Sequence, residues 1–188
     1  MTDFSKSPFH RLVDSRISVR KFQDKPVDRQ ILLQCVDAAR LAPSAVNVQP
    51  WRFALVDDPG TKHKLAEHTF SGIFRATRWA AKAPVLVVIF ADLDILTNRL
   101  GKQITGINYY LIDIGIAGEH FVLQAQELGL GSCWIGWFNA KRAKKVLGVP
   151  RSWKAIQMLA AGYPAADYHR TRKRNKLDDI HFFNEYAK

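Results

Sequence analysis

Cysteine is scarce in this chain of 188 residues, and its two cysteines do not have the spacing of a metal or redox motif. Cys35 falls on the apolar side of an expected helix and Cys133 lies in a strand-like run, so we predict that both pack in the core. Long apolar runs are also lacking: the longest, residues 83–91, has the length of a strand and is too short to cross a bilayer. The N-terminal residues lack the apolar segment of a secretory signal. These absences predict a cytoplasmic protein with no membrane partner.

The common nucleotide-binding and catalytic motifs are absent as well. The sequence contains neither G-x-G-x-x-G after a strand nor G-x-x-x-x-G-K-[ST], and it has no G-x-S-x-G nucleophile motif. The six histidines include no H-x-x-x-H pair, so we expect no bound metal ion. A bound cofactor, rather than a reactive side chain, is therefore expected to supply the chemistry.

Acidic residues are outnumbered: 17 Asp and Glu stand against 28 Lys and Arg, which gives a formal net charge of +11. This balance is typical of proteins that bind nucleic acid, an anionic membrane surface or phosphorylated ligands. A nucleic-acid-binding module would carry aromatic side chains among its cations, but the basic stretch at residues 170–176 has none before Phe182. We therefore keep nucleic-acid binding as a remote alternative and expect no nucleic-acid partner. A solvated tail is the other interpretation of this stretch.

Hydrophobic periodicity predicts a single domain, residues 1–188, in which helices and strands alternate. Several connections are too short for right-handed crossovers between parallel strands, so a mixed sheet with helices on both faces fits best. The expected helices cover residues 9–14, 28–41, 108–128, 139–147 and a segment from the DDPGT turn to residue 70; the expected strands cover residues 51–56, 85–91, 132–135 and 153–161.

The longest expected helix contains two glycines, Gly115 and Gly118. Each weakens a helix by about 1 kcal/mol relative to Ala, so their presence predicts the close approach of another backbone. That backbone lies either in the same subunit or across a dimer interface.

Three polar segments are candidates for a cofactor site. In the first, RISVRKF at residues 16–22, Arg16, Ser18 and Arg20 occupy alternate positions and would point to one side of an extended segment. Guanidinium groups donate hydrogen bonds in a planar fork, which suits a phosphate or the anionic edge of a ring. A solvated edge strand is the alternative interpretation.

The second candidate, LAPSAVNVQPWRF at residues 41–53, places Ser44, Asn47 and Gln49 in one short connection. These side chains both donate and accept hydrogen bonds, as the edge of a heterocycle does. An ordinary turn explains Ser44 and Asn47 equally well, but it explains Gln49 and the Pro-Trp pair after it less readily.

The third candidate is the basic segment HRTRKRNK at residues 169–176, in which Arg172 and Arg174 could clamp a phosphate. Taken in order, the three segments resemble the FMN-dependent nitroreductase family. The match includes the run Ala-Pro-Ser-x-x-Asn-x-Gln-Pro-Trp at residues 42–51 and a long Gly-containing helix that leads into Gly-Leu-Gly-Ser and a strand. It covers nearly the whole chain.

The resemblance implies an α+β fold with a mainly antiparallel central sheet between helices, a three-layer α-β-α sandwich, and a homodimer with FMN at the subunit interface. By analogy, Arg16, Arg172 and Arg174 would hold the phosphate. Arg20 would lie near the pyrimidine edge of the ring and stabilise the reduced flavin. Ile17 and Ser18 are further expected FMN contacts. Pro43, Ser44, Ala45 and Asn47 match the loop that the partner subunit donates to the site. The remaining expected contacts are Gln49, and Ile135 and Gly136 at a strand end.

The resemblance also implies an FMN-dependent oxidoreductase that passes hydride from NADH or NADPH to an electron-poor small molecule, such as a nitroaromatic or a quinone, by a ping-pong mechanism. The flavin supplies the redox chemistry, so no catalytic side chain is expected. Relatives in this fold also dehalogenate, oxidise azolines or fragment the flavin, and a flavoprotein sensor without turnover is a further alternative. The acceptor, the preferred donor and the aromatic residues of the substrate pocket stay open.

Overall fold

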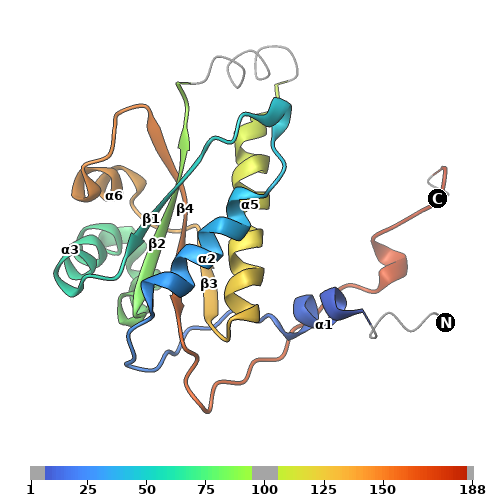
Figure 1. The fold of residues 1–188 in the computed structure, drawn as a ribbon, viewed down its shortest axis with the longest axis horizontal. Coiled ribbons are helices and arrows are strands. Elements are labelled where there is room, and N and C mark those ends of the chain that lie inside the picture. Colours follow the sequence, from blue (N-terminus) through green and yellow to red (C-terminus); the bar gives the residue numbers. More distant parts are fainter. Residues whose placement is uncertain (1–6, 95–105, 186–188) are drawn as a thin grey trace.

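The computed structural model describes residues 7–94 and 106–185 of the chain. Four strands form one sheet in the order β1-β2-β4-β3, and every neighbouring pair is antiparallel. Helices cover both faces of this sheet (Figure 1), which confirms the expected α+β sandwich of three layers. The strands lie within one residue of their expected bounds: they are β1 (Trp51–Val56), β2 (Val85–Asp92), β3 (Gly131–Ile135) and β4 (Trp153–Gly162).

Three of the helices begin at side-chain caps. Asp28, Asp58 and Asn139 each accept a hydrogen bond from a backbone N–H of the turn that follows, at 2.8, 2.7 and 3.0 Å. None of the helices in the described ranges is long and apolar enough to cross a membrane. The helices are α1 (Pro8–Ser15), α2 (Arg29–Arg40), α3 (Pro59–Thr69), α5 (Tyr109–Glu127) and α6 (Ala140–Leu147), together with the 3₁₀ helices η2 (Ala45–Asn47), η3 (Gly72–Lys82) and η4 (Leu177–Asp179).

Strand β2 is buried along almost its whole length because it contributes to two hydrophobic clusters. Val87 and Ile89 belong to the cluster on the side of α2 and α5, whereas Leu86, Val88 and Phe90 belong to the cluster on the side of α3, η3 and α6. Successive side chains of a strand point to opposite faces, so a strand with helices on both sides is apolar at every position.

The two glycines of α5 have different surroundings. A Cβ atom at Gly118 would lie 2.2 Å from Cη2 of Trp134 in β3, so the missing side chain makes room for the indole. The close neighbour is therefore a side chain of the same subunit, and our expectation of a backbone neighbour is wrong at this position. Around Gly115, which is exposed, no atom of the described residues lies within 4 Å of such a Cβ.

Both ends of the described chain extend away from the sheet (Figure 1). No residue of α1 is buried, and the segment that follows residue 165 runs past α1. Exposed apolar surface of this kind is typical of a region that another chain covers. The large apolar side chains exposed here include Phe9, Val13, Leu177, Ile180 and Phe183.

Candidate functional site

The N-terminal segment, residues 16–22, lies against the outer edge of β3. Ser18 forms an isolated parallel bridge with Ser132, and Val19 N donates a hydrogen bond to Ser132 O at 2.9 Å. Val19 is 1% exposed and packs over Gly131, where a Cβ would lie 2.6 Å from its Cγ2. Because side chains alternate along an extended segment, Val19 points into the core and its two neighbours point to the opposite side.

Three polar side chains of this segment come close to one buried thiol. Cys133 on β3 is 3% exposed, and burial raises the pKa of its thiol. The charge of Arg20, a hydrogen bond from Ser18 and the charge of Arg16 oppose this rise and lower the pKa by smaller amounts. Arg16, Ser18 and Arg20 thus lie around Cys133 at the edge of β3. Cys35 is fully buried too, and burial raises its pKa to about 12, so both cysteines pack in the core as predicted.

The two arginines of the segment have partners on opposite faces of the sheet. The side chain of Arg16 is 15% exposed, and its Nε lies 3.9 Å from Oε1 of Glu119 on α5. The guanidinium of Arg20 lies 5.6 Å from the centre of the Trp79 ring on η3, which is the distance of a cation–π contact. One cation therefore lies toward α5 and the other toward η3.

The C-terminal arginines differ in their contacts. Arg172 donates from Nη1 to the carbonyl oxygens of Val13 and Arg16, at 3.1 and 2.9 Å, and from Nη2 to Asp14. Its guanidinium therefore holds the C-terminal segment against the end of α1, beside Arg16. Arg174 donates to the preceding carbonyl at 3.0 Å, and no contact between it and Arg16 is found in the described ranges. A phosphate-binding role for both stays a prediction, and for Arg172 it would require an exchange of these partners.

The loop at residues 43–49 has an uncommon backbone conformation. Val46, Asn47 and Gln49 have φ angles of 45°, 58° and 52°, a region that residues other than glycine rarely adopt, β-branched ones least of all. The polar side chains bond within the loop: Ser44 Oγ accepts from Gln49 N at 3.0 Å, and Gln49 Nε2 donates to Asn47 Oδ1 at 2.9 Å. Such a conformation persists only where the surroundings hold it, and it is frequent at functional sites.

Asp113 on α5 holds this loop. Its Oδ1 accepts a hydrogen bond from Ala45 N at 3.0 Å, whereas its Oδ2 is buried and has no hydrogen-bond partner among the described residues. The residue is 3% exposed; burial raises the pKa of the carboxyl, and the bond from Ala45 N opposes that rise. A buried oxygen without a partner is costly, so we include Asp113 in the candidate site.

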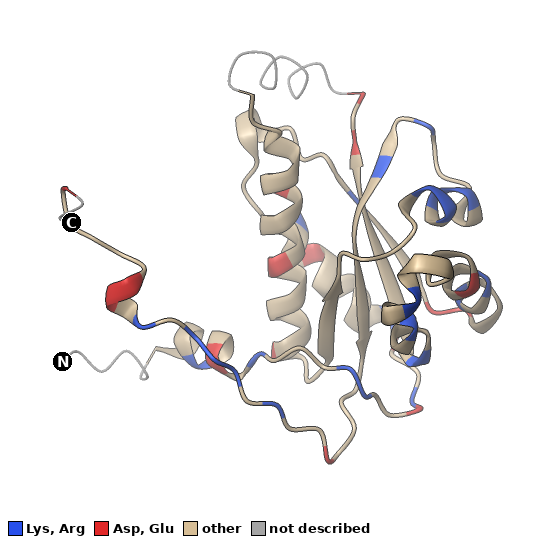
Figure 2. Cartoon of the chain, turned by 180° about the vertical axis from the view of Figure 1, so that it is seen from behind, with Lys and Arg blue, Asp and Glu red and all other residues tan. Residues whose placement is uncertain are grey.

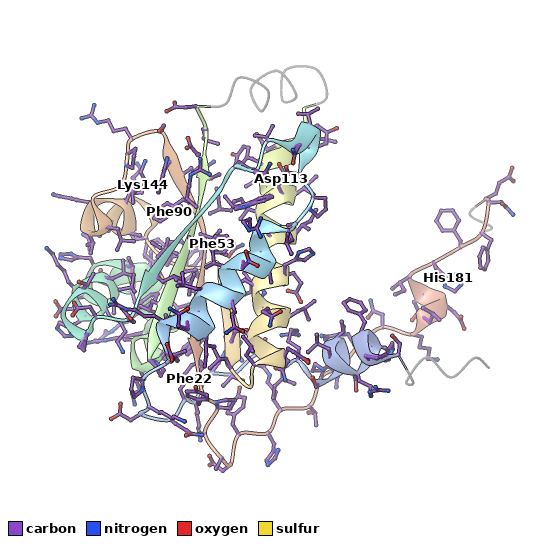
Figure 3. The ribbon with its side chains drawn as sticks, in the orientation of Figure 1. Phe22, Phe53, Phe90, Asp113, Lys144 and His181 are labelled. Carbon is purple, nitrogen blue, oxygen red and sulfur yellow. The ribbon has the colours of Figure 1, made fainter. Side chains whose placement is uncertain are left out.

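Within one chain, the loop and the arginines lie at different ends of α5. Figure 1 shows η2 at the N-terminal end of α5, and it shows α1, which leads to Arg16, near the C-terminal end. Asp113, which holds the loop, lies in the N-terminal part of α5 (Figure 3). The loop residues therefore do not meet Arg16, Ser18 and Arg20 in one subunit, and a site that contains both groups needs a second chain. These loop residues are Pro43, Ser44, Ala45, Asn47 and Gln49.

The end of β3 presents an exposed backbone next to a buried amide. Ile135 is 2% exposed and Gly136 is exposed. A Cβ at Gly136 would lie 3.7 Å from Oε1 of Gln157 on β4, and this oxygen is buried without a hydrogen-bond partner in the described part of the chain. Gln157 stands beside a β-bulge in the pairing of β2 with β4, and bulges often re-aim side chains next to functional sites.

A hollow of about 430 Å³ opens between α5 and the sheet near this strand end. Its walls are apolar apart from the amide of Gln157. Apolar walls with a small number of polar groups are typical of sites that bind a planar organic molecule. The lining residues are Leu111, Ile114, Gly115, Trp134, Ile156 and Gln157.

The aromatic residues of this region have different roles. Tyr110 and Phe138 are buried and belong to the two hydrophobic clusters. Trp79 lies next to Arg20, and Trp137 is 53% exposed, with its Nε1 donating to Ile73 O at 2.8 Å. Of these four residues, Trp79 and Trp137 therefore stay candidates for a substrate pocket.

Asp113 and Gln157 are two residues of the candidate site that we did not expect from the sequence. Each interrupts a run of apolar residues: Asp113 stands between two isoleucines, and Gln157 stands between an isoleucine and a methionine. Buried polar side chains usually have hydrogen-bond partners, so a polar residue inside an apolar run is the signal that could have identified both.

The sequence model of the nitroreductase family matches residues 13–163, which include residues 16–22, the loop at residues 43–49 and the end of β3. The chain belongs to the nitroreductase family. Arg172 and Arg174 lie beyond the matched residues, so the family match does not extend to the C-terminal arginines.

Known members and relatives of the nitroreductase family agree with this assignment. An NADH dehydrogenase of Thermus thermophilus is 30% identical in an alignment that covers 81% of this chain and 84% of that protein. Iodotyrosine deiodinase 1 of Mus musculus is 29% identical in an alignment that covers 92% of this chain and 68% of that protein. The structure of an FMN-dependent nitroreductase from Clostridium difficile R20291 superimposes with a TM-score of 0.73 at 28% identity, and covers 92% of this chain and 98% of that one. The names of these proteins support an oxidoreductase.

Proposed function

We propose that this nitroreductase-family protein is an FMN-dependent oxidoreductase that transfers hydride from NADH or NADPH to an electron-poor small molecule, such as a nitroaromatic or a quinone, by a ping-pong mechanism. The observation that carries the proposal is the position of the segment with Arg16, Ser18 and Arg20 along the outer edge of β3, the strand that ends in the exposed backbone of Gly136. The family match and the names of the relatives support it.

The residues present fit FMN. Its phosphate carries about two negative charges at neutral pH, and Arg16 and Ser18 offer a guanidinium and a hydroxyl for it. The flavin ring is planar and has an N–H on one edge, and the hollow beside Trp134 has apolar walls and one amide oxygen. That oxygen, Oε1 of Gln157, is buried without a partner in the described residues and would gain a donor.

FMN supplies the redox chemistry when it is bound, and the chain positions it and sets the field around it. Arg20 would place a positive charge near the pyrimidine edge of the ring, where negative charge develops on reduction. Its guanidinium lies beside Trp79 on the η3 side of the sheet, so this role requires the side chain to turn toward the ring. The exposed backbone at Gly136 allows a ring to approach the end of β3 closely.

The proposal includes a cytoplasmic homodimer in which the loop at residues 43–49 of each subunit completes the site of the other. Three features of the structure support a second chain: the loop lies apart from Arg16 within one subunit, Gly115 is uncovered, and α1 and the C-terminal segment expose apolar side chains. A two-fold dimer would cover the same surfaces on both subunits.

The first measurement is the absorption spectrum of the purified protein, followed by addition of NADH or NADPH without oxygen. We expect a flavin band that bleaches with at least one donor and returns when a quinone or a nitroaromatic is added. A flavin band that resists both donors would favour a flavoprotein sensor. A colourless protein that does not take up added FMN would overturn the proposal.

Reductive dehalogenation is a second candidate, because a deiodinase is 29% identical to this chain over most of its length. The same reduced protein can be mixed with an iodinated phenol and with a quinone. Release of iodide coupled to return of the flavin band would favour dehalogenation, whereas oxidation by the quinone alone would favour the first candidate.

A further inference from the structure

The layer of α3 and α6 is strongly basic. Residues 128–166 contain no Asp or Glu, and this stretch includes α6, which carries Lys141, Arg142, Lys144 and Lys145. Figure 2 shows the basic segments of α6 close to those of α3, on the opposite side of the sheet from α5.

Two adjoining hollows lie in this layer, and no carboxylate lines either of them. The larger has a volume of about 590 Å³ and is lined by residues of both helices: Lys64, His68, Arg142, Lys145 and Val146. The second has a volume of about 450 Å³ and shares one of these cations; it is lined by Lys141, Lys144, Lys145, Gly148, Val149 and Arg151. Cations from two helices therefore face one concave surface.

The lining cations are not neutralised by the protein. None of them takes part in an ion pair found in the described ranges. The acidic residue of α3, Glu67, lies 3.4 Å from His63 Nε2 and lines a different hollow. Arg142 is held in place, because its Nη1 donates to Ser71 Oγ at 2.9 Å in the turn after α3. Its guanidinium therefore lines the larger hollow in a fixed position.

This arrangement is unfavourable for α6 itself. Lys141 is three and four residues from Lys144 and Lys145, and Arg142 is three residues from Lys145, so like charges are neighbours on the helix surface and repel. Lys141 and Arg142 also stand in the first turn, where the helix dipole disfavours cations. Lys144 and Lys145 stand in the last turn, where the helix dipole favours cations, but an anion between α3 and α6 would relieve the repulsion among the four cations and the cost in the first turn.

We infer that the hollow between α3 and α6 binds a compact, multiply charged phosphate group, free or carried by a small molecule. Phosphate oxygens accept several charge-assisted hydrogen bonds at once, and Lys64, Arg142 and Lys145 provide donors from both walls. Neither hollow is lined by Phe, Tyr or Trp, so a platform for stacking the bases of a single strand is lacking. The site lies across the sheet from the hollow beside Trp134 and does not depend on the proposed redox function.

The test is a calorimetric titration of the full chain with inorganic pyrophosphate at low ionic strength, in excess FMN so that a flavin-phosphate site is filled. We expect one saturable site per chain. The double variant Arg142→Gln/Lys145→Gln should bind about tenfold or more weakly, because two charge-assisted hydrogen bonds are lost. The control Lys25→Gln/Lys82→Gln loses the same charge outside both hollows and should stay within about twofold of wild type.

Three outcomes would overturn the inference: no saturable binding of pyrophosphate, an equal loss of affinity in both double variants, or tighter binding of a short DNA duplex that the hollow variant abolishes. The last would assign the surface to nucleic acid. Lys64 lies on the other wall of the hollow, and Lys64→Gln leaves the hydrogen bond between Arg142 and Ser71 intact. If the double variant does not fold, the affinity of Lys64→Gln for pyrophosphate provides the same test, and a loss of affinity is expected. The flavin spectrum of each variant reports separately on the redox site, and we expect it to match wild type.

Discussion

Two buried oxygen atoms, Oδ2 of Asp113 and Oε1 of Gln157, have no hydrogen-bond partner among the described residues. Leaving a buried acceptor unpaired costs about 1–3 kcal/mol. Both residues lie next to segments proposed to bind FMN, because Asp113 bonds to the loop at Ala45 and Gln157 lies behind Gly136. Natural proteins accept such local costs mainly at functional sites, where a ligand or a partner chain supplies the missing donor.

We expect Asp113→Ala and Asp113→Asn to separate hydrogen bonding from charge. Alanine removes the acceptor of Ala45 N–H, so it should lower the free energy of unfolding by about 1–3 kcal/mol and weaken FMN binding. Asparagine keeps an acceptor and removes a buried charge, so it should retain stability and FMN affinity close to wild type. Urea denaturation and FMN fluorescence titration measure the two effects, and equal losses in both variants would contradict this account.

The difference in stability between wild type and Asp113→Asn should depend on pH, because burial raises the pKa of Asp113 above 3.8 in the folded protein. The folded protein binds this proton more readily than the unfolded chain does. The stabilising contribution is therefore present at pH values below 3.8 and is lost as the pH rises through the raised pKa. Wild type should gain stability relative to Asp113→Asn as the pH falls through this range; a difference that does not change with pH would contradict the shift.

Most helices and strands were predictable because their signals are local. The strands are apolar runs between Gly, Pro and polar turns, and Asp28 and Asn139 cap the helices that follow them. Helix η3 was not predicted, because the 3₁₀ geometry does not follow the 3.6-residue period and contacts far along the chain help to fix it. Thr77 Oγ1, for example, donates to Trp137 O at 2.7 Å, 60 residues away.

The candidate site was predictable only in its segments. The residues of RISVRKF and of the loop at residues 43–49 stand together in the sequence, and their types indicate their chemistry. The hydrogen bond from Ala45 N to Asp113 joins residues 68 apart, and that from Arg172 to Arg16 O joins residues 156 apart. Only the folded chain brings these groups together, so the sequence could not identify their partners.

The glycines of α5 give a matched pair of substitutions. Gly118→Ala would place a Cβ 2.2 Å from Trp134, so it should lower the free energy of unfolding by about 1–3 kcal/mol. Gly115→Ala meets no atom of the described residues within 4 Å and should raise that free energy by up to about 1 kcal/mol through helix propensity. Urea denaturation at one protein concentration measures both, and shifts of the same sign would count against the contact with Trp134.

Among the described residues, α1 and the C-terminal segment carry the exposed apolar side chains that we connect with assembly. Ile180 is 66% exposed and Phe183 is 81% exposed, and Leu177 in the same segment is 60% exposed. A surface of this kind is stable in water when a second subunit covers it.

The double variant Ile180→Asp/Phe183→Asp should therefore dissociate the proposed dimer and, because the loop at residues 43–49 would no longer reach the site of a partner, should also lose most of its FMN. Sedimentation velocity and the flavin absorbance measure the two effects. Ile73→Asp changes a residue that is 74% exposed on η3 and serves as the control, which should stay dimeric and yellow. A double variant that stays dimeric with its full flavin content would refute this arrangement.

The pairing of residues 16–22 with β3 has a consequence for solubility. Strand β3 ends the sheet on one side, and an unpaired outer strand is a template on which another chain can add. Val19 N donates a hydrogen bond to Ser132 O of that strand. Beyond the strand, Gln23 N donates to Tyr163 O, and Phe22 forms a bridge with Pro164. The segment that carries the arginines of the proposed flavin site thus also covers part of an open sheet edge. A substitution that detaches this segment would expose the edge to pairing with other chains, and so lower the solubility of the protein, and would weaken the proposed flavin binding as well.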